Sequence, residues 1–422
     1  MTAPAPRPPL KPLDDALADL LAQAAPLPGE DVVDTFDADG RVLVADAVSP
    51  LRVPPHDNSA MDGYALRCAD LPLAASDGLP REALAVLPVS QRIAAGTAPV
   101  PLVPGTAARI FTGAPLPPGA DAVVMQEECE ALEGGARVRI QAAPRPGQWV
   151  RRAGEDIEAG AAVLSAGTRL GPAALGLAAS IGLARLRVAP RPRVALFSTG
   201  DELVMPGEVP PERMPPGAIY NSNRFFLRAM LQRLGCEVTD LGIVPDRRDA
   251  TERALREAAQ GHDLVLTSGG VSVGEEDHVK PAVAALGRLD LWQVALKPGK
   301  PFAYGRIGER ARFMGLPGNP VSSFVTFAVL VRPFLLRLQG ACDVAPRAVD
   351  ARAHFAWPRA DKRREFLRVR RNAEGGLELF PHQGSGVLTS AAWGDGVVDN
   401  PPGRTIAHGD TVRFIPFADL LA

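Results

Sequence analysis

The sequence predicts a multidomain protein of α/β and β architecture: a central three-layer α/β domain, two flanking β modules and a mixed N-terminal domain. Three observations support this prediction. The 422 residues exceed what one hydrophobic core usually serves. A content of 46% hydrophobic and 22% charged residues is typical of globular rather than disordered chains. Strand and helix patterns alternate over residues 191–340, whereas short strands punctuated by Pro and Gly dominate on either side.

The N-terminal half predicts a mixed domain that is interrupted by an inserted β domain. A helical leucine pattern covers residues 12–25, a strand-like run follows at 41–47, and a second helical pattern surrounds residues 175–181. The insert contains short β runs at Arg109–Phe111, Ala122–Met125 and Arg137–Ile140. We therefore expect four domains: residues 10–53 with 150–190 (mixed), 54–149 (inserted β), 191–340 (α/β) and 341–422 (C-terminal β).

The α/β domain is expected to contain a mostly parallel sheet with helices on both faces, because buried strand runs alternate with amphipathic helices. Its strands are predicted at residues 194–197, 236–244, 264–266, 291–296 and 313–316. Its helices are predicted at 224–234, 249–260 with Asp249 as the cap, 279–286, and after Asn319. The last 80 or so residues return to short strands, ending at Thr411–Phe414.

Composition and cysteine usage exclude several classes of function. A net charge of -2 gives no basic excess for wrapping nucleic acid. Cys68, Cys129, Cys236 and Cys342 form no C-x-x-C pair and the six histidines are scattered, which argues against a zinc or histidine metal site and favours a reducing, cytoplasmic compartment. The apolar stretch 321–338 is broken by Arg332 and Pro333, and the start of the chain is not a signal peptide, so we expect no membrane span.

The predicted strands of the α/β domain end in turns that suit a ligand site. In an open α/β sheet, ligands bind beyond the carboxyl ends of the strands. Every predicted strand end carries a glycine-rich turn or a charged group. These turns are Ser198–Glu202, Pro245–Asp246, Thr267–Gly274 followed by Glu275–Asp277, Lys297–Pro301 and Leu316–Pro320.

These turns predict a pocket for a nucleotide or another phosphate compound. Consecutive glycines let backbone N–H groups approach an anion, and Pro320 suits the first turn of a helix that faces the same crevice. Lys297 and Lys300 could neutralise phosphate oxygens, while Glu202, Asp246 and Asp277 could hold Mg²⁺. Each turn alone could be only a surface loop. Their coincidence at one sheet edge favours a site that cleaves a phosphoanhydride.

Seven strings, in order and over nearly the whole chain, resemble the molybdopterin molybdenumtransferase (MoeA) family, which is related to the E domain of gephyrin. They are Asp57–Ala65, Phe111–Pro115, Gly154–Ile157, Ser198–Leu203, Ser268–Gly274, Lys297–Pro301 and Leu316–Ser322. The resemblance implies an elongated homodimer whose third domain is of molybdopterin-adenylyltransferase type. It implies that the enzyme inserts molybdate into adenylylated molybdopterin and releases AMP, in a cleft between the α/β domain of one subunit and the inserted β domain of the other.

The resemblance also implies the functional residues. The catalytic group is Asp62, Thr112, Asp156, Glu202, Asp246 and Asp277, of which Glu202, Asp246 and Asp277 are the expected Mg²⁺ ligands. The substrate-binding group is Ser268, Gly269, Gly270, Ser272, Lys297, Lys300, Pro317, Gly318, Asn319, Pro320, Arg368 and Ser385. The sequence departs from the family pattern at Asn221, where relatives often carry Asp, and at Gln293, where some carry Lys.

Three questions stay open at this point. An enzyme that adenylylates molybdopterin would share the α/β domain, although the flanking β modules argue against it. A scaffold that clusters membrane receptors, as in the eukaryotic relative, would also share the fold, although no receptor-binding segment is evident. The choice between molybdate and tungstate is not determined by the sequence. The resemblance also allows contacts with other enzymes of molybdenum-cofactor synthesis.

Overall fold

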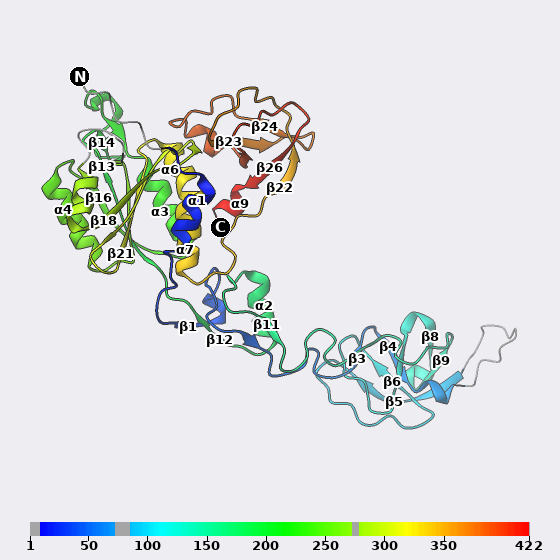
Figure 1. The fold of residues 1–422 in the computed structure, drawn as a ribbon. Helices are drawn as coiled ribbons and strands as arrows, with labels where there is room; N and C mark the ends of the chain where they lie inside the picture. Colours follow the sequence, from blue (N-terminus) through cyan, green and yellow to red (C-terminus); the bar gives the residue numbers. More distant parts are fainter. Residues whose placement is uncertain (1–8, 72–84, 272–277, 422) are drawn as a thin grey trace, which may run out of the picture.

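The computed structural model describes residues 9–71, 85–271 and 278–421 of the chain. Figure 1 shows an elongated arrangement in which the α/β domain and the C-terminal β domain lie side by side at one end. The mixed domain follows, and the inserted β domain lies at the far end from the α/β domain.

The mixed domain is held together by two short antiparallel strand pairs. β1 (Asp31–Asp34) pairs with β12 (Arg185–Val188), and β2 (Ala47–Val48) pairs with β11 (Ala162–Leu164), next to helix α2 (Pro172–Ser180). The predicted strand over residues 41–47 is wrong as a continuous element. Its residues divide their bridges between two segments, Val42 opposite Arg169 and Leu43 opposite Val188, so no single ladder forms.

Helix α1 (Leu13–Leu21), which lies within the predicted 10–53 piece, packs against the α/β domain. Its buried residues Leu13, Ala16 and Leu20 belong to the same apolar cluster as the helix that ends the α/β domain. Figure 1 shows α1 beside α7. The apolar stripe that predicted the helix therefore fastens the N-terminal segment to the α/β domain.

The inserted domain is a six-stranded sheet in the order β7-β4-β6-β5-β9-β8. Its strands are β4 (Gly63–Leu66), β5 (Ala85–Ile93), β6 (Ala107–Ile110), β7 (Ala122–Met125), β8 (Cys129–Leu132) and β9 (Arg137–Ile140). The chain enters through β3 (Asn58–Ser59) and leaves through β10 (Val150–Arg151), and these two strands pair with each other. The two ends of the insert therefore lie side by side.

The α/β domain contains a six-stranded sheet in the order β16-β13-β17-β21-β20-β18, with an apolar cluster on each face. Its strands are β13 (Arg193–Thr199), β16 (Glu237–Val244), β17 (Leu264–Ser268), β18 (Gly287–Gln293), β20 (Pro301–Ile307) and β21 (Ala311–Leu316). Only β20 runs against its neighbours, so the predicted three-layer, mostly parallel architecture is confirmed. The helices are α3 (Asn223–Arg233), α4 (Arg248–Ala259), α5 (Val279–Leu286) and the helical stretch Pro320–Leu338.

Three predicted details of this domain are wrong. The expected strand 291–296 is an edge strand that begins at Gly287 and ends at Gln293, and β20 was not predicted. Asp249 does not cap α4, because it lies inside the first turn and pairs with arginines instead. Strand β20 was hidden because it begins at Pro301, inside the segment interpreted as a lysine loop.

The helix Pro320–Leu338 consists of α6 (Pro320–Thr326), a π-helical turn over Phe327–Val331, and α7 (Arg332–Leu338). Its length and mean hydropathy of 1.6 would suffice to cross a membrane, but 83% of it is buried inside the protein. The wider π turn lies just before Pro333, which has no N–H to donate to the preceding turn. The helix is the core element on which α1 and the sheet pack.

The C-terminal domain contains a third six-stranded sheet, in the order β19-β23-β25-β26-β22 with β24 paired to β23. Its own elements are β22 (Val349–Arg352), β23 (Arg364–Arg371), β24 (Leu377–Leu379), β25 (Gly396–Asn400), β26 (Thr411–Pro416), α8 (Thr389–Trp393) and α9 (Phe417–Leu420). The edge strand β19 (Leu296–Lys297) comes from the α/β domain and pairs in parallel with β23. A segment between β18 and β20 therefore joins the two domains.

Candidate active site

A cleft of about 480 Å³ lies at the carboxyl ends of the parallel strands of the α/β domain. Its wall is formed by turns that follow β13, β17 and β21, together with the start of α3 and the pair β14 (Leu203–Val204) and β15 (Ile219–Tyr220). The lining residues include Thr199, Gly200, Glu202, Asn221, Asn223, Asp246, Ser268, Gly269, Gly270, Pro317, Gly318, Asn319 and Pro320. The structure therefore brings together most of the strand-end residues that the sequence singled out.

Two glycines of this cleft adopt positive φ angles, and one of them also has a close backbone contact. Gly269 has φ +93°, and a Cβ there would lie 2.8 Å from the carbonyl oxygen of Thr199. Gly200 has φ +144°, and a Cβ there would lie 2.5 Å from a carboxylate oxygen of Glu202, which folds back over it. Side chains at these positions would be strained and would collide with the wall of the cleft. Two strand ends can thus approach each other and a ligand closely.

Two asparagine side chains present unpartnered polar atoms to the cleft. Asn223 donates to the carbonyl of Gly318 at 2.7 Å and to the hydroxyl of Ser268 at 3.2 Å, which ties α3 to the strand-end turns. Among the described residues, Oδ1 of Asn223 and Nδ2 of Asn221 have no hydrogen-bond partner. Their side chains belong to residues only 7% and 2% exposed. Buried polar atoms are nearly always hydrogen-bonded, so these two atoms suit a polar ligand.

The acidic residues of the cleft are Glu202 and Asp246. The backbone N–H of Asp246 donates to Asp201 at 3.2 Å, which joins the turns after β13 and β16. Among the residues that the structure describes, no three His, Cys, Asp or Glu side chains gather as a metal-binding group. Two carboxylates fit Mg²⁺, which usually takes one or two carboxylates together with water and substrate phosphates. The third expected ligand, Asp277, and the predicted contact Ser272 lie outside the described residues.

The turn Leu316–Pro320 places the N-terminus of α6 at the cleft. Pro320 occupies the first turn of the helix, as predicted, and Asn319 precedes it without a side-chain capping bond. The N–H of Val321 donates to the carbonyl oxygen of Ser385 at 2.9 Å. The start of this helix is therefore bonded to the C-terminal domain, and the predicted residue Ser385 lies there through its backbone.

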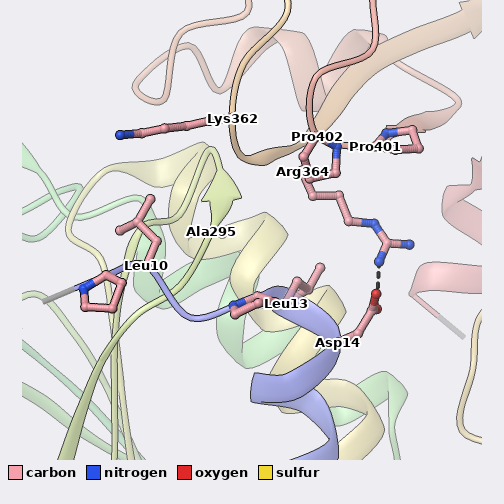
Figure 2. Close-up of a pocket in the computed structure, with 10 residues that line it drawn as sticks. Leu10, Leu13, Asp14, Ala295, Lys362, Arg364, Pro401 and Pro402 are labelled. Atoms are coloured by element: carbon pink, nitrogen blue, oxygen red, sulfur yellow. Dashed lines mark hydrogen bonds and ion pairs between the residues drawn. The ribbon is translucent and has the colours of Figure 1, made fainter.

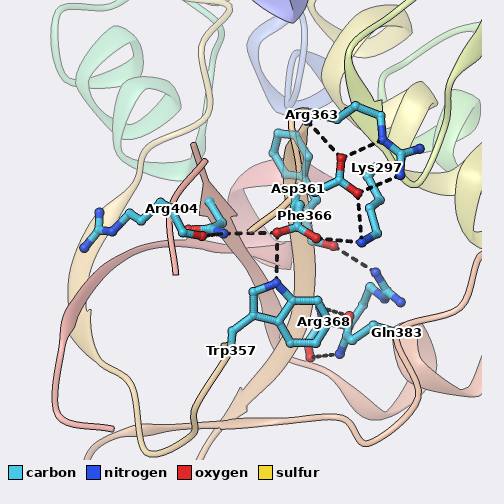
Figure 3. A network of polar contacts seen from close by, with 10 residues as sticks. Lys297, Trp357, Asp361, Arg363, Phe366, Arg368, Gln383 and Arg404 are labelled. Atoms are coloured by element: carbon cyan, nitrogen blue, oxygen red, sulfur yellow. Dashed lines mark hydrogen bonds and ion pairs between the residues drawn. The ribbon is translucent and has the colours of Figure 1, made fainter. Parts of the chain in front are cut away.

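Lys297 and Lys300 are not among the described residues that line the cleft. The ammonium of Lys297 pairs with Glu365 at 2.9 Å and with Asp361 at 3.2 Å, as Figure 3 shows. Burial lowers the pKa of Lys297, but the hydrogen bonds to these two carboxylates outweigh burial, so its pKa is raised. The expected neutralisation of a phosphate by Lys297 would require its ammonium to leave both carboxylates.

The carboxylates that hold Lys297 are themselves fixed by other side chains. Glu365 is 1% exposed and accepts hydrogen bonds from Trp357 at 2.8 Å and Asn400 at 3.2 Å. Arg363 binds Asp361 through two nitrogens, at 2.9 and 2.8 Å, and holds the pKa of that carboxyl well below its usual value. The network gives Lys297 one fixed position at the boundary between the two domains.

Arg368 lies deeper in the same region and has no carboxylate partner among the described residues. It is 1% exposed, and its guanidinium donates to the hydroxyl of Ser390 and to the carbonyls of Phe366 and Gly384. Burial lowers its pKa to about 10. Figure 3 shows it close to Gln383. A buried cation without a counter-charge is costly, and an anion bound beside Gly384 and Ser385 would offset that cost.

Asp62 and Thr112 lie in the inserted domain, far from the cleft of the same chain (Figure 1). One oxygen of Asp62 accepts both the N–H and the hydroxyl of Thr112, each at 2.8 Å. These bonds, the backbone bond first, lower the pKa of Asp62. Asp156 is exposed, and its N–H donates to Val53 in the segment that joins the mixed and inserted domains. The chain does not bring these three residues to its own cleft.

A larger cavity of about 660 Å³ lies elsewhere, where the N-terminal segment meets the C-terminal domain (Figure 2). It is lined by Pro9, Leu10, Pro12, Leu13, Asp14, Ala295, Lys362, Arg364, Pro401 and Pro402. An ion pair between Arg364 and Asp14, at 2.7 Å, crosses it. Because this cavity contains none of the strand-end turns, it is not the candidate active site.

Comparison with known proteins assigns the family. Three family models match: the MoeA N-terminal region (domain I and II) over residues 11–182, a probable molybdopterin binding domain over 195–337, and the MoeA C-terminal region (domain IV) over 350–417. A molybdopterin molybdenumtransferase of Haemophilus influenzae is 38% identical, over 97% of this chain and 99% of that protein. The chain belongs to the MoeA family. A second molybdopterin molybdenumtransferase, from Nostoc, is 36% identical over 91% of this chain and 88% of its own length.

MoeA structures have the same architecture as this chain. A molybdopterin biosynthesis MoeA protein from Pyrococcus horikoshii aligns with a TM-score of 0.81 and 28% identity, covering 97% of this chain and all of that one. Another structure from the same organism gives a TM-score of 0.74 and 32% identity, with 97% and 99% coverage. The predicted family and fold class are therefore confirmed.

Sequence reasoning missed several MoeA cleft residues. It did not identify Asn223 as a lining residue, and it noted Asn221 only as a departure from relatives. The signal that could have identified both is the string Asn221-Ser222-Asn223 directly before a helix, because asparagine is favoured at such starts. In the structure the side-chain oxygen of Asn221 accepts the N–H of Arg224 in the first turn of α3 at 3.3 Å, and its Nδ2 has no partner among the described residues.

Proposed function

We propose that this chain inserts molybdenum from molybdate into adenylylated molybdopterin and releases AMP. The single observation that carries the proposal is the cleft at the strand ends, with its close-packed glycines and its two unpartnered asparagine atoms. The names of its MoeA relatives support the same reaction. In this proposal the turns Ser268–Gly270 and Pro317–Pro320 bind the pterin and its anhydride through backbone groups.

Glu202 and Asp246 are proposed to hold Mg²⁺, together with Asp277. The cation would supply positive charge to the anhydride oxygens as AMP departs. Without the cation, these carboxylates would repel the substrate, because both the carboxylates and the substrate are negatively charged. The carboxylate of Glu202 lies next to Gly200 in the wall of the cleft.

Molybdate is proposed to bind near Arg368 and Ser385 at the boundary between the α/β and C-terminal domains. The buried guanidinium of Arg368 supplies a positive charge that lacks a carboxylate among the described residues. The hydrogen bond between Val321 and Ser385 places this region beside the start of α6, which lines the cleft. The oxyanion would therefore lie next to the pterin end of the substrate. Lys297 would reach the anions only after leaving Glu365 and Asp361, whereas Lys300 directly precedes Pro301 of the cleft wall and is proposed to contact them.

We further propose that the protein acts in the cytoplasm as a homodimer. The inserted domain is far from its own cleft, so Asp62, Thr112 and Asp156 could act on the substrate only from a second copy. Other enzymes of molybdenum-cofactor synthesis are proposed as partners that deliver the substrate or receive the product. No nucleic acid or membrane partner is proposed.

The test is an assay of AMP release by the purified protein with adenylylated molybdopterin, molybdate and Mg²⁺. Glu202→Gln should lower the rate about 100-fold, the size of effect seen when one electrostatic contact to developing charge is removed. Glu208→Gln is the control, because Glu208 is exposed and does not line the cleft, and its rate should stay near that of the wild type. Chelation of Mg²⁺ should stop the reaction.

Two results would overturn the proposal. One is a wild-type protein that releases no AMP under these conditions. The other is a Glu202→Gln variant as fast as the control, which would separate the cleft from the chemistry. Release of pyrophosphate from ATP and molybdopterin would instead identify the adenylylating reaction. Asp277→Ala should lose AMP release while folding normally, and an unchanged rate would remove Asp277 from the mechanism.

A further inference from the structure

The described wall of the α/β cleft carries no basic side chain. Among its described lining residues there are carboxylates, amides and hydroxyls but no lysine or arginine. Of the two lysines expected on phosphate, Lys297 is engaged by Glu365 and Asp361, and Lys300 precedes Pro301 of the cleft wall without lining the described cleft. An anhydride carries several negative charges, and a site that binds one usually supplies guanidinium or ammonium groups. The cations that complement this substrate must therefore include groups from outside the wall of the cleft.

The inserted domain carries two arginines side by side on one face of its sheet. Arg92 on β5 lies directly opposite Arg109 on β6, and Arg109 lies directly opposite Tyr64 on β4. The three residues form one cross-strand row. Phe111, two residues beyond Arg109, lies against both cations, with its ring centre 4.6 Å from the Arg92 guanidinium and 4.7 Å from that of Arg109. The ring of Tyr64 is 5.1 Å from Arg109.

Among the described residues, neither arginine forms an ion pair with a carboxylate, although the charge of Arg109 contributes to the lowered pKa of Asp62. Like charges directly opposite each other on neighbouring strands are destabilising. Arg109 donates to the carbonyl of Gly63 at 3.1 Å and to Gln126 at 2.8 Å, both neutral acceptors. Arg92 is exposed, and within residues 9–71, 85–271 and 278–421 it has no hydrogen bond or ion pair.

Other arginines of the same domain are paired differently. Arg139 binds Glu130 on the neighbouring strand, Arg137 lies 3.6 Å from Glu133, and Arg67 binds Asp70. The sheet thus neutralises those arginines locally with carboxylates. The Arg92–Arg109 pair instead contacts the Phe111 ring and, among the described residues, forms no ion pair with a carboxylate. Such a pair is preorganised for a ligand with two or more anionic oxygens.

The pair lies next to the turn that the proposed reaction already uses. Arg109 and Phe111 immediately precede Thr112, whose N–H and hydroxyl bind Asp62. Arg109 bonds to Gly63, the residue after Asp62. A second copy that brings Asp62 and Thr112 to the cleft would therefore bring both guanidiniums with them. The charge of the arginine pair is thus complementary to the described wall of the cleft, which carries carboxylates but no lysine or arginine.

We propose that Arg92 and Arg109 bind the anhydride phosphates of adenylylated molybdopterin held in the cleft of a second copy. This inference rests on the proposed function. Arg109 is the fixed member, because two of its nitrogens are already bonded and its plane is set. Arg92 is the adaptable member, because only the Phe111 ring restrains it. The proposed role of Glu202 and Asp246 on Mg²⁺ is unchanged, since the guanidiniums would bind phosphate and not these carboxylates.

The first experiment measures kcat and KM for adenylylated molybdopterin by AMP release, with molybdate and Mg²⁺ in excess. Arg92→Gln should raise KM about tenfold, the effect of losing one charge-assisted contact, and the double variant with Arg109→Gln about 100-fold. Arg109→Lys keeps the charge and should recover part of the loss. Arg139→Gln, on the same sheet, is the matched control and should keep the KM of the wild type.

The choice of Arg92 makes the result independent of folding, because no described residue depends on its guanidinium for a hydrogen bond. Urea denaturation of Arg92→Gln should match the wild type. The KM of the wild type should also rise with salt more steeply than that of the double variant, because salt screens the attraction between the two guanidiniums and the anionic substrate. A KM unchanged in both Arg92→Gln and the double variant, with AMP release intact, would overturn this inference and leave the proposed function standing.

The second experiment tests whether the arginines act on a second copy. The double arginine variant is mixed with the Glu202→Gln variant in equal amounts. The mixture is then unfolded and refolded, so that subunits associate at random. Random association makes half of the dimers mixed dimers. If each site combines the cleft of one copy with the arginines of the other, each mixed dimer has one intact site out of two, which gives about a quarter of the wild-type activity. No recovery would overturn the inference, since the arginines would then act within their own chain or on the fold. A wild type without AMP release would refute the function and this inference together.

Discussion

Replacing Lys297 by Met tests whether this lysine is a structural cation or a substrate contact. The change removes the ammonium from two carboxylates, one of which, Glu365, is 1% exposed. Removing one partner of a buried pair costs about 3–5 kcal/mol. The Lys297 side chain is 35% exposed, so solvent screens part of the interaction and the cost should fall to about 2 kcal/mol. Glu365 also keeps its hydrogen bonds from Trp357 and Asn400.

The assay is urea denaturation of the whole protein, followed by tryptophan fluorescence. Trp357 lies in the affected network, 5.7 Å from the ammonium of Lys297. Lys362→Met is the control, because Lys362 is an exposed lysine of the same loop, and its denaturation midpoint should be unchanged. In a double-mutant cycle, Lys297→Met and Glu365→Gln together should cost less than the sum of the two single changes. Equal midpoints for wild type and Lys297→Met would refute this reasoning and return the lysine to its expected role on phosphate.

Two further predictions concern the cleft and the inserted domain. Gly269→Ala should lower the free energy of unfolding by about 2 kcal/mol, because its φ is +93° and Thr199 leaves no room for a Cβ. The rate of AMP release should fall as well. Gly308→Ala, with φ +59° and open space, should cost less in the same urea titration. Thr112→Val should raise the pKa of Asp62 towards its usual value, because a bond that stabilises the ionised form is lost. The acid limb of the pH–rate profile should then move to higher pH, and an unmoved limb would show that Asp62 ionisation does not control the rate.

Local sequence patterns were sufficient to predict the bounds of elements that are stabilised by their own sequence neighbours. The predicted bounds of β7, β9 and α5 agree with the structure residue by residue. The glycine-rich turns of the cleft were also predictable, since parallel strands end at one sheet edge. These features need no knowledge of a distant partner.

Features that depend on distant pairing could not be read from the sequence. Strand β19 has only two residues, and its partner β23 lies much later in the chain. For the same reason, the pairing of Lys297 with Asp361 and Glu365 could not be predicted, because these two carboxylates belong to another domain. A lysine flanked by prolines and glycine has the same local signature whether it binds a phosphate or a carboxylate.

The two-residue strand β19 also bears on how the chain matures as it leaves the ribosome. When the α/β domain has been synthesised, β23 has not yet emerged, and Leu296 and Lys297 have no sheet edge to join. The turn that leads into Pro301, a residue of the cleft wall, gains its support only once the last domain has folded. A nascent or prematurely terminated chain would thus lack a finished cleft, which keeps incomplete products from binding the reactive pterin.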